Sequence, residues 1–223
     1  MNLSASECGE IYSVVFENSD RHYKIGLLLA ENKEYGSAIS HLILGVEEAL
    51  KGLALFLESK NFEIKQVDSV KLLFSNHRSR HNVFKEFFSV WRVLKIIVEK
   101  EVESEEQKSP KSKWSKRLGN ISFWLNVVAN GLNGFVSYYW WRHADSLKQQ
   151  GFYVDFQDRL ISPVDLTKQD YDEALNQTNV VKKEIDQFVS VVNKLSDDEL
   201  KESKQLLKES QLYSLLGETI TRK

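Results

Sequence analysis

The amino-acid sequence predicts an all-α protein, and three observations carry that prediction. The chain has 223 residues but only two prolines and ten glycines, so long helices can run without interruption over most of its length. Apolar residues recur at helical spacing, and a serine or threonine followed three residues later by an acid marks several helix starts. Only residues 152–156 read as an extended run. We therefore expect one helical domain over residues 1–223, with its core at about 4–150 and additional C-terminal helices at about 166–216.

The composition is that of a folded protein without a strong electrostatic field. Apolar residues make up 42% of the chain and charged residues 28%, which argues against disorder. The net charge of -2 disfavours tight sequence-independent DNA binding, because counterion release needs a basic surface. Cys8 is the only cysteine, which excludes intrachain disulfides and fits a reducing compartment. The N-terminal residues lack the features of a signal peptide, so we expect a cytoplasmic protein.

The first helix is expected to begin at a capping box, in which Ser4 and Glu7 satisfy each other's backbone amides. It should run to about Lys33, with a bend or a short break at residues 18–22. The chain should then turn at residues 34–36, where a glycine is available.

The second helix is predicted over residues 37–60, where apolar residues cover a wide arc. Such a helix is central to a bundle, because it must be covered on several sides. Gly45 and Gly52 lie one heptad apart on one face. Glycine there costs on the order of 1 kcal/mol each in helix propensity unless a close contact compensates, so we expect another helix to cross at these glycines.

A third helix is predicted over residues 70–102, followed by a charged surface connection. The fourth helix contains residues 121–141, an uncharged stretch just long enough to span a bilayer. Its serines, asparagines and glycines favour a buried bundle helix instead, so no membrane contact is expected. The aromatic residues 138–141 read either as core or as a base-stacking surface. This helix should end near residue 150, with Gly151 as a left-handed cap.

Two more helices are predicted towards the C-terminus. Thr167 and Ser196 are each followed three residues later by an acid, the pattern of a helix N-cap. The helices should cover about residues 168–194 and 197–216. No partner is evident for the extended run at residues 152–156, so no sheet is expected.

Two neighbouring glutamates in the second helix have different expected surroundings. Glu47 and Lys51 are four residues apart in the favourable order, which predicts a plain surface ion pair. Glu48 falls about 20° from His41 on the helical wheel, in an apolar sector. A carboxylate there needs a cationic or hydrogen-bonding partner, so Glu48 belongs either to a structural buried pair or to an active site.

Residues 76–81 contain the densest cluster of chemically active side chains, which are His77, Arg78, Arg80 and His81. The two histidines are four apart, a spacing that can bind a metal. The chain has no HExxH and no Glu-x-x-His pair, so we predict no metal. It also has no Walker A or dinucleotide-binding motif, so we predict no cofactor. Together with Glu48, these groups supply the base, acid and cation that metal-free RNA cleavage requires. The same residues could equally tie helices together as a structural polar cluster.

Five short segments follow one another in a recognisable order: Ser37–Ile39, Glu47–Lys51, Asn76–His81, Gly151–Asp155 and Ser162–Pro163. Over about residues 25–190 this order resembles the AbiV family of phage abortive-infection proteins in the HEPN superfamily. The resemblance implies a HEPN-like helical bundle and a toxin-like role, in which an infected cell stops growing before phage can spread. It also implies a homodimer, because HEPN proteins commonly pair. The wide apolar arcs and the glycine face of the second helix favour a homodimer as well, since they suggest more helix contact than one small bundle needs.

HEPN ribonucleases typically carry an arginine followed by a histidine after four to six intervening residues. No arginine of this chain is followed by histidine at that spacing, so the predicted catalytic set is instead Glu48, His77, Arg78, Arg80 and His81. Our first hypothesis is an abortive-infection effector that arrests the cell, by metal-independent RNA cleavage or by a translation block. The alternative is a non-catalytic helical protein that binds a phage or host protein. A phage-encoded protein is the expected trigger.

Overall fold

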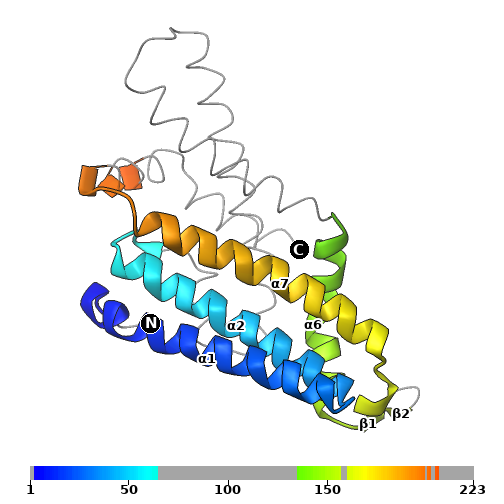
Figure 1. Ribbon diagram of the computed structural model, residues 1–223. Helices are drawn as coiled ribbons and strands as arrows, with labels where there is room; N and C mark the ends of the chain where they lie inside the picture. The colour runs from blue at the N-terminus through cyan, green and yellow to red at the C-terminus, as the bar shows by residue number, and fades with distance from the viewer. Residues whose placement is uncertain (1–2, 65–134, 157–159, 199, 202–203, 206–223) are drawn as a thin grey trace, which may run out of the picture.

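The structure is a computed structural model that describes residues 3–64, 135–156, 160–198, 200–201 and 204–205. Long helices dominate this part of the chain: α1 (Ala5–Glu31), α2 (Tyr35–Ser59), α6 (Phe135–Phe152) and α7 (Lys168–Val192). The predicted all-α bundle is therefore confirmed. Figure 1 shows α1, α2 and α7 side by side with α2 in the middle, and α6 also packs on α2. Within the described residues, no helix is long and apolar enough to cross a membrane.

The first helix begins where its capping box predicts. The Ser4 backbone N–H donates to the Glu7 carboxylate at 2.7 Å, and the Glu7 N–H donates to Ser4 Oγ at 3.3 Å. The helix is continuous through residues 18–22, so the break considered there is absent. Two polar side chains in that segment, Asn18 and Ser19, form hydrogen bonds to α2, which explains why a polar segment stays helical.

The turn between α1 and α2 comes earlier than expected. Lys33 adopts the left-handed conformation, with φ of 63°, and α2 already begins at Tyr35. Gly36 therefore lies inside the helix and is required for a different reason. A Cβ at Gly36 would lie 2.9 Å from the Cα of Pro163, which opens the short 3-10 helix η2 (Pro163–Asp165).

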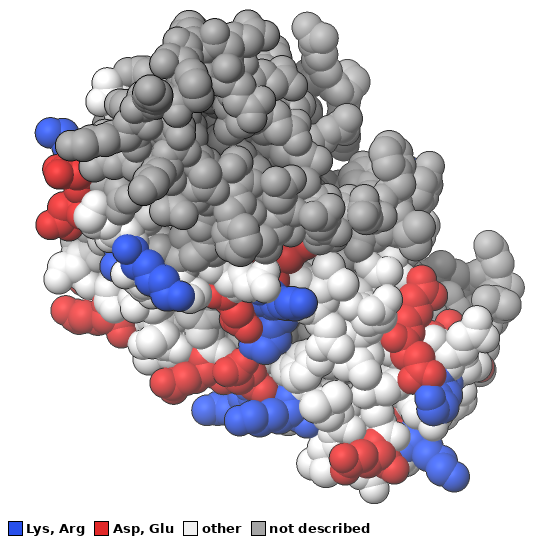
Figure 2. Space-filling model, turned by 45° about the horizontal axis from the view of Figure 1, so that its top comes forward, with Lys and Arg blue, Asp and Glu red and all other residues white. Residues whose placement is uncertain are grey.

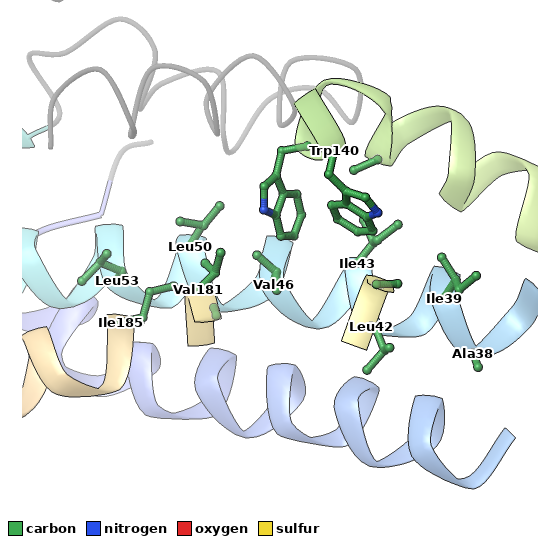
Figure 3. Packing of buried hydrophobic residues seen from close by; sticks show 14 of the residues in the cluster. Ala38, Ile39, Leu42, Ile43, Val46, Leu50, Leu53, Trp140, Val181 and Ile185 are labelled. Carbon is green, nitrogen blue, oxygen red and sulfur yellow. The ribbon is translucent and has the colours of Figure 1, made fainter. Parts of the chain in front are cut away.

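The core forms around α2, as its wide apolar arc predicts. Figure 3 shows Ile43 and Val46 of α2 beside Trp140 of α6, while α7 contributes Val181 and Ile185 to the same cluster. Apolar side chains of α2 that are buried include Ala38, Ile39, Leu42, Leu50, Leu53 and Phe56. Trp140 and Trp141 are also buried, so these two aromatic residues belong to the core and not to a base-stacking surface.

The helix that crosses at the glycines of α2 is α1. A Cβ at Gly45 would lie 3.2 Å from the Ser19 carbonyl oxygen, and a Cβ at Gly52 would lie 2.9 Å from the Phe16 ring. Ser19 Oγ also donates to the Gly45 carbonyl at 2.6 Å. The predicted close contact is confirmed, and it is formed within one chain.

The end of α6 differs from the sequence prediction. Gly151 does not have a positive φ and lies within the helix, so the left-handed cap predicted there is wrong. The residue is instead a point of close contact, because a Cβ would overlap Ser40 Oγ and the Gly36 carbonyl group. Chain packing, and not backbone conformation, requires this glycine.

The chain then forms a small antiparallel hairpin, so the expectation of no sheet is wrong. Strand β1 (Asp155–Phe156) pairs with β2 (Leu160–Ile161), with Asp155 opposite Ile161 and Phe156 opposite Leu160. Each strand has two residues, too few for an alternating pattern to be visible in sequence.

Helix α7 begins at its predicted cap, where the Thr167 backbone N–H and Oγ1 both donate to the Asp170 carboxylate. Its buried side chains pack on α2, and two polar contacts join its outer edge to α1. Lys182 Nζ lies 2.5 Å from Asp20 Oδ1, and the Tyr23 hydroxyl donates to the Asn179 amide oxygen. The structure also describes helical residues after Ser196, at 197–198, 200–201 and 204–205, within the last predicted helix.

Candidate functional site

The adjacent carboxylates of α2 point to different helices. Glu47 is buried, and its carboxylate lies 2.6 Å from Lys148 Nζ of α6. Lys148 also lies 3.3 Å from the more exposed Asp145. The predicted surface pair of Glu47 with Lys51 is therefore wrong. Since α2 is apolar on almost every side, the wheel alone could not show which glutamate faces a buried cation.

Glu48 lies on the seam between α1 and α2. Its Oε1 accepts from Lys51, and its Oε2 accepts from Asn18 Nδ2 at 3.3 Å. The Glu48 and Lys51 side chains are each 15% exposed, so solvent can reach this pair, unlike the pair of Glu47. The cationic and hydrogen-bonding partners that the sequence required for Glu48 are thus both present.

A pair of histidines lies on the same seam. The Nδ1 atoms of His22 in α1 and His41 in α2 are 3.0 Å apart, and the ring centroids are 5.2 Å apart with a tilt of 32°. At this distance one ring donates its Nδ1 proton to the bare Nδ1 of the other. The sequence placed His41 near Glu48 but did not single out His22. The sequence did contain a signal for His22, because Asn18 and His22 are four residues apart and so lie on one face of a helix whose start was predicted.

The surroundings keep both imidazoles less basic than usual. Burial lowers the pKa of His22, Glu48 acts in the opposite direction, and the positive charges of Lys51 and Arg21 lower it further. Burial lowers the pKa of His41 as well, with a further contribution from His22. Both rings are therefore neutral near pH 7, as a donor and acceptor pair requires.

Aromatic rings continue from this pair to the surface. The Phe152 ring, at the end of α6, meets His41 edge to face with centroids 5.4 Å apart. Tyr153 follows at 6.2 Å from Phe152. Ser40 Oγ donates to the Lys148 carbonyl at 2.8 Å, which anchors α6 against the start of α2 beside His41.

The other predicted catalytic residues, His77, Arg78, Arg80 and His81, lie outside the described residues. Their convergence with Glu48 therefore remains a prediction. In the part of the chain that the structure describes, no three histidine, cysteine or acidic side chains gather as a metal site. The chemistry available at the seam is proton exchange between neutral imidazoles, beside a carboxylate and two cations.

The fold and the seam define an α-helical bundle with a paired-histidine site. A family model described as AbiV, of the HEPN group, matches residues 7–183. Because this match covers most of the chain, the protein belongs to the AbiV family. Neither curated proteins nor solved structures give a match. Family membership assigns the chain to abortive infection, a defence of bacteria against phage.

Proposed function

We propose that the chain arrests infected cells by cutting RNA without a metal, and that His22 and His41 transfer the protons. The observation that carries this proposal is the 3.0 Å distance between the two Nδ1 atoms, in a half-buried seam that solvent can reach. Metal-free RNA cleavage needs a base for the 2′-hydroxyl and an acid for the leaving 5′-oxygen. Two imidazoles linked by one hydrogen bond supply both functions at neutral pH.

The protons balance in a simple relay. The ring that donates its Nδ1 proton has a bare Nε2, which takes the proton of the 2′-hydroxyl as the 2′-oxygen attacks phosphorus. This ring passes its Nδ1 proton to the partner ring, and the partner releases its Nε2 proton to the 5′-oxygen as the bond from phosphorus breaks. The products are a 2′,3′-cyclic phosphate and a 5′-hydroxyl, and the two rings have exchanged tautomers.

The charges beside the pair suit a phosphodiester. The positive charges of Lys51 and Arg21 act on His22 together with the carboxylates of Glu48 and Glu47, and we assign the phosphate to the side of the two cations. The negative charge of Glu48 raises the pKa of His22, and its carboxylate forms an ion pair with Lys51. Figure 2 shows positive and negative side chains interspersed over the visible described surface, which fits local recognition of RNA better than a broad basic patch.

The cluster predicted at His77, Arg78, Arg80 and His81 stays part of this proposal as the second group of residues that contacts the phosphate. Its arginines supply further cations, and its histidines offer another acid or base. A His81→Asn variant decides between the two clusters. Loss of cleavage in that variant alone, with His22→Asn unaffected, would move the catalytic site to residues 77–81.

A non-catalytic interaction protein is the rival function, and a specific observation favours it. Large apolar side chains are exposed around the hairpin, including Tyr153, Val154, Phe156, Leu160 and Val164, and such a surface suits a protein partner. A phage-encoded trigger or a translation factor would bind there. A homodimer also remains a proposal, although the glycine face of α2 no longer supports it, because α1 covers that face.

The test is RNA cleavage by purified protein in the presence of a chelator. We expect wild-type protein to cut RNA in EDTA and to leave cyclic phosphate and 5′-hydroxyl ends. His22→Asn and His41→Asn should lose about 10²–10⁴-fold in rate, the usual contribution of general acid and base catalysis. His143→Asn, at an exposed histidine of α6, is the matched control and should keep full activity. No cleavage by folded wild-type protein, or cleavage abolished by EDTA, would overturn the proposal.

A further inference from the structure

We infer that Phe152 and Tyr153 form a stacking subsite for an unpaired base of single-stranded RNA, next to the imidazole pair. The inference rests on the proposed function, since it assigns the base-binding part of the same site. The residues involved lie at the end of α6, where the chain leaves the bundle.

Four rings contact one another one after the next, and we call this series the row. Centroid distances are 5.2 Å from His22 to His41, 5.4 Å from His41 to Phe152 and 6.2 Å from Phe152 to Tyr153. The row runs from the half-buried pair outward, because Phe152 is 37% exposed and Tyr153 is 62% exposed. The Phe152 and Tyr153 rings are inclined by 68°, so a base stacks on one of them at a time, and its phosphate would then lie close to the imidazoles.

The platform is held by the bundle and not by a free loop. Gly151 is buried against Ser40 and Gly36 of α2, and the Tyr153 N–H donates to the Gln149 carbonyl at 2.9 Å. The backbone under both rings is thus an extension of α6. A backbone held in this way keeps both rings beside His41, which lowers the ordering cost of binding a base.

The charges and the shape point to single-stranded RNA as the occupant. Arg21 directly precedes His22 in α1, and its positive charge and that of Lys51 act on His22 together with the Glu48 carboxylate. The cations therefore belong to the imidazole end of the row and the exposed rings to the other end, as phosphate and base do in one nucleotide. A base in a duplex is stacked between its neighbours and does not present its face. Stacking tolerates any base, so little sequence preference is expected.

Binding of a fluorescent eight-nucleotide RNA to the full chain tests the subsite. Stacking contributes about 1–3 kcal/mol per base, so Tyr153→Ala should raise the Kd by about 5- to 150-fold. Tyr153→Phe keeps the ring and should bind like wild type. Val154→Ala is the matched control, because Val154 is the next residue, is 65% exposed and has no ring.

The result that would overturn the subsite is an unchanged Kd for Tyr153→Ala. Equal weakening by Val154→Ala would also overturn it, because general apolar contact would then replace stacking. If wild-type protein binds no single-stranded RNA, the subsite is wrong and the hairpin surface is left to a protein partner. Cleavage measured on the same proteins separates the two proposals. If Tyr153→Ala binds RNA more weakly but the wild-type protein does not cleave RNA, only the proposed function is rejected. If the wild-type protein cleaves RNA and Tyr153→Ala has an unchanged KM, only the subsite is rejected.

Discussion

Glu47 of α2 and Lys148 of α6 form a salt bridge of 2.6 Å although they are 101 residues apart in sequence. Their side chains are 6% and 5% exposed, so the pair is enclosed by the bundle. The next residue, Glu48, forms a pair with Lys51 that solvent reaches. Two adjacent glutamates thus allow a comparison of a buried and a partly exposed ion pair on one helix.

Removing one partner of the buried pair should destabilise the fold strongly. Glu47→Gln leaves the Lys148 ammonium only the more exposed Asp145 at 3.3 Å, and we expect a loss of about 3 kcal/mol in the free energy of unfolding. Glu48→Gln should cost at most about 1 kcal/mol. The double variant Glu47→Leu with Lys148→Met should recover most of the loss, because no buried charge remains. Equal effects of Glu47→Gln and Glu48→Gln in urea unfolding would show that the pair is not buried as described.

Two glycines should respond to alanine with opposite signs. Gly151→Ala would force a Cβ onto Ser40 and Gly36, and overpacking of this kind costs about 1–3 kcal/mol. At Gly9, in α1, the nearest atom to a new Cβ is the Ser59 Cβ at 3.7 Å. Gly9→Ala should therefore stabilise the protein by about 0.5–1 kcal/mol through helix propensity. A gain in melting temperature for Gly151→Ala would contradict the close contact at the end of α6.

The imidazole pair should make the protein less stable in mild acid. Burial lowers the pKa of both histidines in the folded state. Below about pH 6.5 the unfolded chain therefore binds more protons than the folded protein does. The free energy of unfolding should therefore fall as the pH drops from about 7 towards the lowered pKa values. His41→Gln should reduce this slope. Identical slopes for wild type and His41→Gln in urea unfolding between pH 5 and 8 would contradict the lowered pKa.

Glu184 of α7 should have the opposite pH dependence. Burial raises the pKa of its carboxyl to about 7, and among the described residues its Oε1 has no hydrogen-bond partner. The folded state keeps the proton while the unfolded chain releases it above about pH 4.5, so stability is lost as the pH rises through this range. Glu184→Gln should be more stable than wild type at pH 8, by on the order of 1 kcal/mol after solvent screening.

The difference in stability between Glu184→Gln and wild type should disappear below about pH 4.5, where the carboxyl is protonated in both the folded and the unfolded state. Glu173→Gln, at an exposed glutamate of the same helix, is the control and should not change stability. A Glu184→Gln variant that is no more stable than wild type at pH 8 would show that the carboxyl is solvated.

Local signals in the sequence predicted the helix starts well, and non-local contacts explain the errors. The capping box of Ser4 and Glu7 was predictable because both partners lie within one turn. Glu47 was assigned to Lys51 because its true partner, Lys148, comes from a distant helix. Gly151 resembled a helix cap for the same reason, since the contact that requires glycine is made by α2.

The candidate site was only half visible in the sequence. His41 and Glu48 share one helix, so their spacing placed them together. His22 was missed because its polar segment was interpreted as a bend or break, and the hydrogen bonds that keep this segment helical come from α2. Its pairing with His41 depends on the register of two helices, which the glycine face of α2 suggests but does not define.

The most direct test of the central claim measures phage protection and thermal stability on the same His22→Asn and His41→Asn variants. Asparagine keeps a polar, hydrogen-bonding side chain in the seam but cannot exchange protons near pH 7. We predict that each variant loses protection by about 100-fold or more in plating efficiency, as the loss of acid and base catalysis requires, while its melting temperature changes by only a few degrees. Folded variants that still protect at the wild-type level would show that the imidazole pair is structural and that the effector acts in another way.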